Sequence, residues 1–287
     1  MNGIVIIDKP QDWTSQDVVS KLRGVLHTKR IGHGGTLDPM ATGVLPVFVG
    51  RATRAVEFFE HAEKTYEAVL RLGITTDTED ITGEVLEKRN ISVTKEDLLS
   101  VLEEFRGEIQ QIPPMYSAIK INGQKLCDLA RKGREVERKP RTVTIHKLDC
   151  TEFTGETARL TVTCSKGTYI RTLCKDIGER LGCGGCMESL RRTAAGAYTI
   201  SQAIALKDLV DCEDPEAHLL PIDSMFTQYP QRTLTEKQAL RCRNGNSFSI
   251  DLPNGTYRAY DQSGEFLMLA KVEDKVMSTI KSFFDVK

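Results

Sequence analysis

The stretch IGHGGTLDPMATGVLPVFVGRATR, residues 31–54, combines a glycine-rich turn, a Thr-Leu-Asp-Pro turn and an apolar run. The run GVLPVFVG at residues 43–50 predicts a buried strand, because short apolar runs bounded by glycine are typical of sheet interiors. Asp38 lies between the glycines and Pro39, at the entrance to this strand. Since an Asp-Pro pair is usually only a turn, the rest of the chain must show whether Asp38 is structural or chemical.

Length and composition indicate a globular protein with a full core. The chain has 287 residues, of which 40% are hydrophobic and 28% are charged, and this length favours one large domain plus a smaller one. The longest uncharged stretch, residues 193–206, is too short and too polar to span a membrane. The opening sequence MNGIVIIDKP lacks the pattern of a signal or transit peptide. We therefore expect a cytoplasmic protein.

Hydrophobic periodicity predicts an alternation of strands and helices, followed by a linker and a small all-β module. Thr14 and Ser15 are candidate N-caps for the first helix, and Thr94 with Asp97 forms a capping box for a later one. The predicted elements are strands at 3–8, 43–50, 65–73, 141–153 and 157–167, helices at 15–26, 52–62, 95–105 and 168–182, and a linker at 215–230.

Charge is distributed unevenly although the net charge is only −1. Residues 73–108 contain four basic and ten acidic residues, whereas residues 120–147 contain nine basic and three acidic ones. The basic block predicts either a solvated face or a surface for a polyanion, and its composition alone favours the solvated face.

Eight cysteines are scattered through the chain, mostly among apolar neighbours. Cys183 and Cys186 form a CGGC motif with redox or metal spacing, but the sequence has no second CxxC to complete a zinc site. A loop that ends a helix and carries incidental thiols is the favoured interpretation, and a thiol oxidoreductase is a remote alternative.

Five segments together resemble one known family. GHGG alone is not a nucleotide phosphate loop, because no Gly-Lys-Ser/Thr follows it, and KGTY lacks the aromatic positions of an RNA-recognition motif. Taken in order, the segments resemble the TruB family of pseudouridine synthases, and the GTLDP–ATGVLPV–GRAT block is specific to that family. The tail is similar to the PUA-type RNA-binding domain of these enzymes. The five segments are GIVIIDKP, GHGGTLDPMATGVLPVFVGRATR, KTYEAVLRLG, SKGTYIRTL and ESLRR.

The resemblance implies an α+β fold with a mixed, mostly antiparallel central sheet, flanking helices and a small C-terminal β-rich PUA-like domain. It implies a catalytic domain at residues 1–229, with an RNA-gripping insertion at about 113–147, and an RNA-binding domain at residues 230–287. The implied reaction isomerises uridine to pseudouridine at position 55 in the T-loop of tRNA, without a cofactor or a metal. The expected partner is the T-stem and T-loop of tRNA, and the expected state is a monomer with no obligatory protein partner.

Three residues carry the implied chemistry. Asp38 matches the essential carboxylate, and Arg171 matches the arginine that pairs with it and aims it. Tyr66 matches the tyrosine that stacks on the flipped uracil, and its phenol is placed to help remove the C5 proton. The sequence leaves open whether Asp38 attacks the base, attacks the sugar or removes a ribose proton.

The resemblance also implies the residues that bind the RNA. Tyr169 and Leu190 match positions that line the pocket around the target base, and His33 matches a stacking or wedge residue. Lys9 and Pro10 match a motif that supports the Asp38 loop from behind. Because the base must be turned out of its stack, the basic block gains a role in gripping phosphates. Its candidate contacts are Lys120, Lys125, Arg131, Lys132, Arg134 and Arg141.

A non-catalytic protein that binds or folds RNA with the same surface is the alternative hypothesis. It has no need of a carboxylate facing RNA, so the joint presence of Asp38, Tyr66 and Arg171 favours the enzyme.

Overall fold

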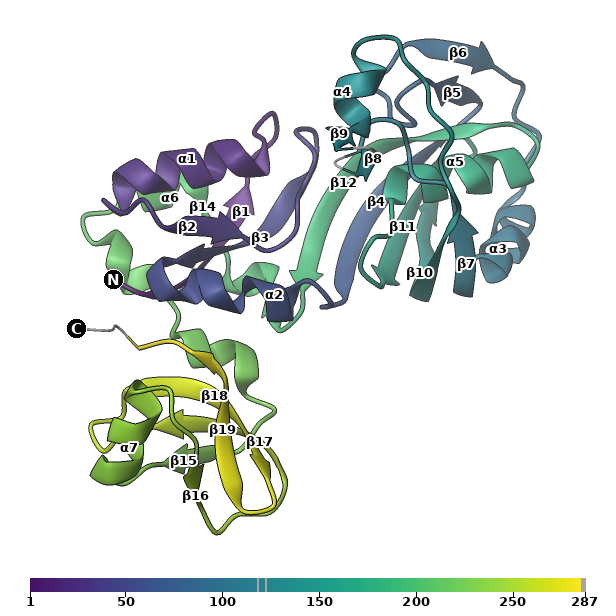
Figure 1. Ribbon diagram of the computed structural model, residues 1–287. Helices are drawn as coiled ribbons and strands as arrows, with labels where there is room; N and C mark the ends of the chain where they lie inside the picture. The colour runs from purple at the N-terminus through teal and green to yellow at the C-terminus, as the bar shows by residue number, and fades with distance from the viewer. Residues whose placement is uncertain (118, 122, 285–287) are drawn as a thin grey trace.

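The larger part of the molecule consists of two lobes, and one sheet runs through both of them (Figure 1). The computed structural model describes residues 1–117, 119–121 and 123–284, apart from the side chains of Lys120, Ile121 and Lys125. Within these residues ten strands form the sheet, in the order β14-β1-β3-β12-β4-β11-β10-β7, with β2 beside β3 and β13 beside β12. Only β1–β14 and β3–β12 are parallel pairs. The predicted mixed, mostly antiparallel α+β architecture is confirmed.

The strands of the larger part are β1 (Gly3–Lys9), β2 (Ile31–His33), β3 (Thr42–Val49), β4 (Lys64–Leu72), β5 (Ile74–Thr76), β6 (Val85–Lys88), β7 (Gly107–Gln111), β8 (Lys120–Ile121), β9 (Gln124–Lys125), β10 (Arg141–Phe153), β11 (Thr157–Cys164), β12 (Gly185–Ala195), β13 (Tyr198–Thr199) and β14 (Ile204–Ala205). Its helices are α1 (Ser15–Val25), η1 (Gly50–Ala55), α2 (Val56–Phe59), α3 (Lys95–Glu104), α4 (Leu126–Ala130), α5 (Ile170–Arg180), η2 (Ile200–Gln202), α6 (Leu206–Asp211), η3 (Pro215–His218) and η4 (Ile222–Phe226).

Local sequence explains the first helix and the strand that follows it. Thr14 caps α1 through a capping box with Asp17, and Val18 and Leu22 pack on the sheet from the buried face of the helix. Strand β3 is buried from Gly43 to Val49, so its side chains contribute to the cores on both faces of the sheet.

Two predictions about local structure are wrong. Residues 52–62 do not form one helix, since a 3-10 turn precedes a single α-helical turn and places Ala52, Ala55 and Phe59 in the core. Residues 215–230 are not a free linker. They contain η3 and η4, and they bury Ile222 and Phe226 against the sheet. The apolar side chains of residues 215–230 therefore hold this segment against the sheet, although its prolines suggested a linker.

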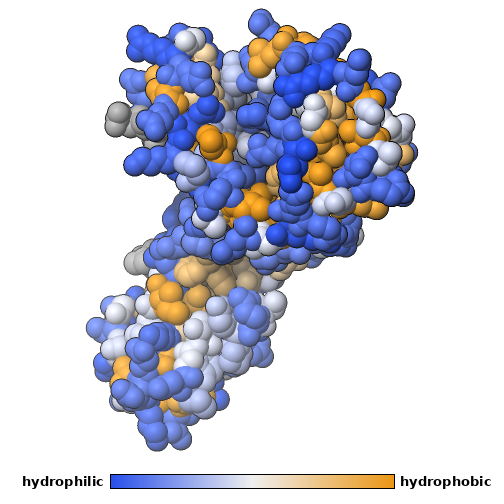
Figure 2. Space-filling model, turned by 90° about the vertical axis from the view of Figure 1, so that its right-hand side faces the viewer, coloured by the Kyte–Doolittle hydropathy of each residue, from blue (hydrophilic) through white to orange (hydrophobic). Residues whose placement is uncertain are grey.

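The smaller domain has its own five-stranded sheet and its own core. Its strands are β15 (Gln231–Thr233), β16 (Phe248–Ser249), β17 (Gly255–Tyr260), β18 (Phe266–Glu273) and β19 (Val276–Ser282). A helix, α7 (Glu236–Arg243), makes it β-rich rather than all-β. Figure 2 shows this domain projecting below the two lobes. Rings of Phe266 and Phe283 pack on Phe226, which joins the domain to the larger part.

Candidate active site

The loop that carries Asp38 is held from behind by the segment between β1 and α1. The Leu37 N–H donates to Ser15 Oγ at 2.9 Å, and the Asp12 N–H donates to the Pro39 carbonyl at 2.8 Å. Lys9 is fully buried, and its Nζ also donates to the Pro39 carbonyl, at 3.2 Å. Burial lowers the pKa of Lys9 to about 8, while the charge of Asp38 opposes the shift. These contacts agree with the supporting role expected of Lys9.

Arg171 reaches Asp38 from the first turn of α5. Its Nη2 lies 3.0 Å from Asp38 Oδ2, and only 7% of its side chain is exposed, against 39% for Asp38. Arg171 is therefore buried, and its guanidinium points at the Asp38 carboxylate rather than into solvent. The structure thus places Asp38 and Arg171 in one ion pair.

Arg171 also joins segments that the sequence analysis did not connect. Its Nη1 donates to the Thr78 carbonyl at 3.1 Å, and its Nη2 donates to the Tyr116 carbonyl at 2.8 Å. Asp80, a second buried carboxylate, has its Oδ2 3.7 Å from Arg171 Nη1. One guanidinium therefore lies between two carboxylates. Asp80 was missed because TTDTED reads as a polar turn, and nothing in that turn signals burial.

The surroundings of Asp38 disfavour the charged form of its carboxyl group. Burial raises its pKa, the charge of Arg171 opposes that shift, and Asp80 adds to it. A half-buried carboxylate that an arginine orients and that has a raised pKa is typical of a reactive group.

Tyr66 lies on β4, directly opposite Arg192 on β12. Burial raises the pKa of the Tyr66 phenol, and the charge of Arg192 opposes the shift. The phenol therefore rests neutral at neutral pH, and Arg192 is the cation that favours its ionised form.

Arg192 is a second residue that the sequence analysis missed, although ESLRR contains it. It is almost fully buried, its Nε donates to the Val44 carbonyl at 2.7 Å, and its Nη2 donates to the Gly35 carbonyl at 3.1 Å. Gly43 makes this possible, because its φ is +100° and a Cβ there would lie 2.2 Å from the Arg192 carbonyl oxygen. The glycine of ATGVLPV thus lets β3 approach β12 closely.

Leu190 lies on the same face of the sheet as Arg192 and Tyr66, two residues along each strand, and Tyr169 lies at the start of α5. Tyr169 is the N-cap residue of α5, where its backbone exchanges two hydrogen bonds with the side-chain amide of Gln111. Burial raises the pKa of Tyr169, and the charges of Arg171 and Asp38 both act on it. Leu190 is buried on β12 opposite Ala68.

His33 ends β2, beside Val47 of β3. Burial and then the charge of Arg192 lower its pKa, so the imidazole is neutral at neutral pH. Its Nδ1 is buried and finds no hydrogen-bond partner among the described residues. A neutral ring is compatible with stacking against a base, because no charge has to be desolvated.

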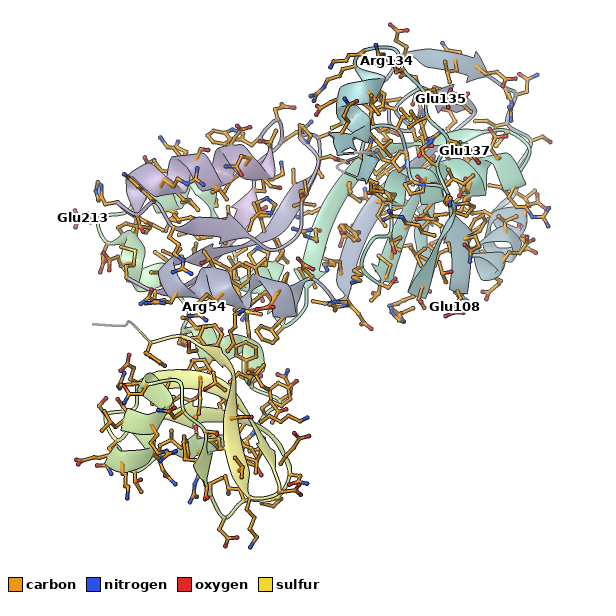
Figure 3. All side chains as sticks on the ribbon, in the orientation of Figure 1. Arg54, Glu108, Arg134, Glu135, Glu137 and Glu213 are labelled. Atoms are coloured by element: carbon orange, nitrogen blue, oxygen red, sulfur yellow. The ribbon has the colours of Figure 1, made fainter. Side chains whose placement is uncertain are left out.

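The basic excursion, which we define as residues 120–141, contains the phosphate contacts expected from the sequence. Arg131, Lys132 and Arg134 are exposed just after the end of α4, and Figure 3 labels Arg134 near the outer edge of the part of the molecule that carries α4. Arg141 is exposed at the start of β10, and its charge acts on Tyr169. The side chains of Lys120 and Lys125 lie outside the described residues. The excursion is a short hairpin of β8 and β9 followed by a five-residue helix.

The CGGC cysteines do not have the environment of a redox pair. Both are buried free thiols, and burial raises the pKa of Cys183 and raises that of Cys186 to about 11. Reactive cysteines need a lowered pKa, so this geometry contradicts the oxidoreductase alternative. Within the described ranges, the His, Cys, Asp and Glu side chains form no group that could hold a metal, and no helix has the length and apolarity to cross a membrane.

Known proteins resemble this chain along most of its length. The model of the TruB family pseudouridylate synthase N-terminal domain matches residues 23–170, and the model of the tRNA pseudouridylate synthase B C-terminal domain matches residues 171–227. The tRNA pseudouridine synthase B of Clostridium kluyveri is 43% identical over 289 residues, covering 99% of this chain and 100% of that protein. Its counterpart in Pseudomonas fluorescens Pf-5 is 45% identical over 282 residues, covering 96% and 92%.

A solved structure has the same fold. The crystal structure of a Cbf5-Nop10-Gar1 complex aligns with a TM-score of 0.74 and 27% identity, covering 99% of this chain and 85% of that one. With family models matching most of the sequence and relatives matching nearly all of it, the chain belongs to the TruB family of pseudouridylate synthases.

Proposed function

We propose that this protein isomerises uridine to pseudouridine at position 55 in the T-loop of tRNA, with Asp38 as the essential carboxylate. Its relatives are tRNA pseudouridine synthases. The observation that carries the proposal is the ion pair of Asp38 with the buried Arg171, because it orients a half-buried carboxylate that a bound base can still reach. The reaction breaks the bond from ribose C1′ to uracil N1 and forms one from C1′ to C5. N1 gains a proton and C5 loses one, so no group is consumed.

The other residues have roles that follow from their environment. Tyr66 stacks on the everted uracil, and its oxygen accepts the C5 proton in the ionised, phenolate form, which the charge of Arg192 favours and which becomes the neutral phenol in the step. Tyr169 and Leu190 form the walls of the base pocket, and the neutral ring of His33 occupies the space that the base vacates in the RNA. Everting the base is required because its reacting atoms are covered within a folded loop.

The division of labour along the chain is part of the proposal. Residues 1–229 form the catalytic domain, and its insertion at about residues 113–147 grips the RNA. Residues 230–287 form an RNA-binding domain. The T-stem and T-loop supply the recognised shape, since folded RNA is read by shape, phosphate contacts and stacking, and one copy of the chain is sufficient.

Release of tritium tests the reaction itself. A T-arm stem-loop labelled with tritium at uridine C5 should lose its label to water in proportion to the product formed, because C5 exchanges its proton for a carbon bond. The same RNA with cytidine at the target position is the control. Binding without tritium release from the uridine substrate would support a non-catalytic RNA-binding protein.

Tyr66→Phe should bind RNA normally and turn over about 10²–10⁴-fold more slowly, which is the usual contribution of one acid–base group. The ring that stacks is retained, and only the hydroxyl is lost. Single-turnover kinetics on the stem-loop measure the effect. Tyr66→Leu is the matched variant, and it should also lose binding, since stacking on an aromatic ring contributes roughly 1–3 kcal/mol. A rate for the phenylalanine variant within a few-fold of wild type would mean that the Tyr66 hydroxyl takes no part in the reaction.

Neutralising Arg131, Lys132 and Arg134 together to glutamine should weaken RNA binding and flatten its salt dependence. Each lost phosphate contact should lower the slope of log affinity against log salt by about 0.7–0.9. All three side chains are exposed, so the fold should be unaffected.

Affinities measured at several salt concentrations provide the check. The matched control neutralises three exposed cations outside the excursion: Arg23, Lys29 and Lys95. Equal slopes for the two triple variants would mean that the basic excursion is only a solvated face and does not contact phosphates.

A further inference from the structure

A cavity of about 550 Å³ lies between α1 and α6, at the end of β1. The two helices pack beside each other on the lobe that carries the Asp38 loop (Figure 1). This volume is in the range of pockets that hold small organic ligands. The chemistry assigned above does not use it.

One side of the cavity is apolar and includes an aromatic ring. Pro10, Trp13, Leu206 and Val210 contribute to it. Trp13 is only partly buried, so part of its surface is available to a ligand. A tryptophan face suits a planar, aromatic group such as a nucleobase.

The rim of the cavity carries positive charge that the protein does not neutralise. Asp8 also lies at the rim, but it accepts hydrogen bonds at 3.1 and 2.7 Å from the guanidinium of Arg191 and is thereby paired. Lys9 lines the cavity but directs its Nζ to three backbone carbonyls. Lys21 and Lys207 remain, both exposed and without an ion-pair partner in the part of the chain that the structure describes. An anion near these two lysines is therefore favoured.

We propose that this cavity binds a nucleotide, with its base against Trp13 and its phosphate between Lys21 and Lys207. None of the residues that line this cavity is among those assigned to the pocket around Asp38. The proposal is independent of the isomerisation, because it rests on the lining of this cavity and its test measures binding.

A nucleotide bound here is coupled to the Asp38 loop through the backbone. It packs against Pro10 and Trp13, and the segment between them donates the Asp12 N–H to the Pro39 carbonyl. Asp12 has a φ of +65°, a strained conformation for a residue with a side chain, so contacts that hold this turn matter. An occupied cavity thus stabilises the turn that supports the loop.

Tryptophan fluorescence tests the proposal directly, because Trp13 is the only tryptophan of the chain. Titration with UMP and with AMP should change the emission in a saturable way for at least one of them. Uridine and inorganic phosphate, which each supply half of the ligand, should bind about tenfold or more weakly than UMP, as expected when a charge-assisted contact is lost. No saturable change with either nucleotide at millimolar concentration would overturn the proposal.

Paired variants locate the site. Lys21→Gln combined with Lys207→Gln should weaken nucleotide binding at least about tenfold. Lys95→Gln combined with Lys237→Gln, which removes two exposed charges elsewhere, should leave it unchanged. A nucleotide that binds in the Asp38 pocket instead would have the same affinity for both double variants. Equal affinities would therefore also overturn the proposal.

The source of the nucleotide is decided by competition. If the unlabelled stem-loop displaces, in equilibrium dialysis, the radiolabelled UMP whose binding depends on Lys21 and Lys207, the occupant is a nucleotide of the bound RNA. If UMP stays bound while the stem-loop saturates the protein, the occupant is a free nucleotide. Both outcomes support a nucleotide site and differ only in what fills it.

Discussion

Replacing Asp38 by asparagine should abolish turnover while leaving the folded protein at least as stable as the wild type. Asparagine keeps the shape of the side chain but cannot act as a nucleophile or a base, so the rate should fall by at least about 10²–10⁴-fold. RNA binding should persist, because the phosphate contacts lie elsewhere. Tritium release, RNA affinity and thermal unfolding measure the three quantities. Turnover at even a few per cent of wild type would show that Asp38 is not essential.

The sign of the stability effect follows from the pKa of Asp38, which burial raises above the ordinary value of 3.8 for an aspartate. A carboxyl group with a raised pKa in the folded state contributes stability when it is protonated and loses that contribution as the pH rises above the unfolded value. Ionised Asp38 therefore lowers stability at neutral pH, and the neutral asparagine removes this cost. The advantage of the variant should vanish below about pH 3.8, where wild-type Asp38 is protonated in both states.

Where the sequence carries strong periodicity or a specific motif, it predicts the structure well. The N-cap at Thr14, the capping box at Thr94, the strand at 141–153 and the helix that contains Arg171 all form as expected. Each depends on a local signal, either a cap hydrogen bond, an alternating strand or an amphipathic repeat. The resemblance then supplied the pairing of Asp38 with Arg171, residues that lie far apart in the chain.

The parts of the site that were missed depend on long-range packing. Asp80 and Arg192 are charged residues in segments that read as a polar turn and an ordinary strand, and both are buried by elements distant in sequence. The local sequence does not indicate that a charged side chain is buried, because the groups that pair with it come from distant parts of the chain. Likewise, Ile222 and Phe226 look like part of a linker until β1 and β3 supply the surface that covers them.

Arg171→Ala should be the variant that damages the fold as well as the chemistry. It removes the cation between Asp38 and Asp80 and leaves the Thr78 and Tyr116 carbonyls without their donors. Breaking a buried ion pair by removing one partner typically costs about 3–5 kcal/mol. Most of that cost should come from Asp80, because the partial exposure of Asp38 reduces its share. Chemical denaturation measures the loss, and tritium release should fall with it.

Arg171→Lys separates the charge of the guanidinium from its shape. Lysine keeps one positive charge but has a single nitrogen in place of the fork that contacts four groups, so it should recover part of the stability and little of the activity. The pH dependence adds an independent check, because protonating Asp38 removes one uncompensated charge from the alanine variant. The gap in stability between that variant and the wild type should therefore narrow as the pH falls from 7 towards 4. A gap that is constant over this range, together with full activity of the lysine variant, would mean that Arg171 is only a structural brace and does not orient Asp38.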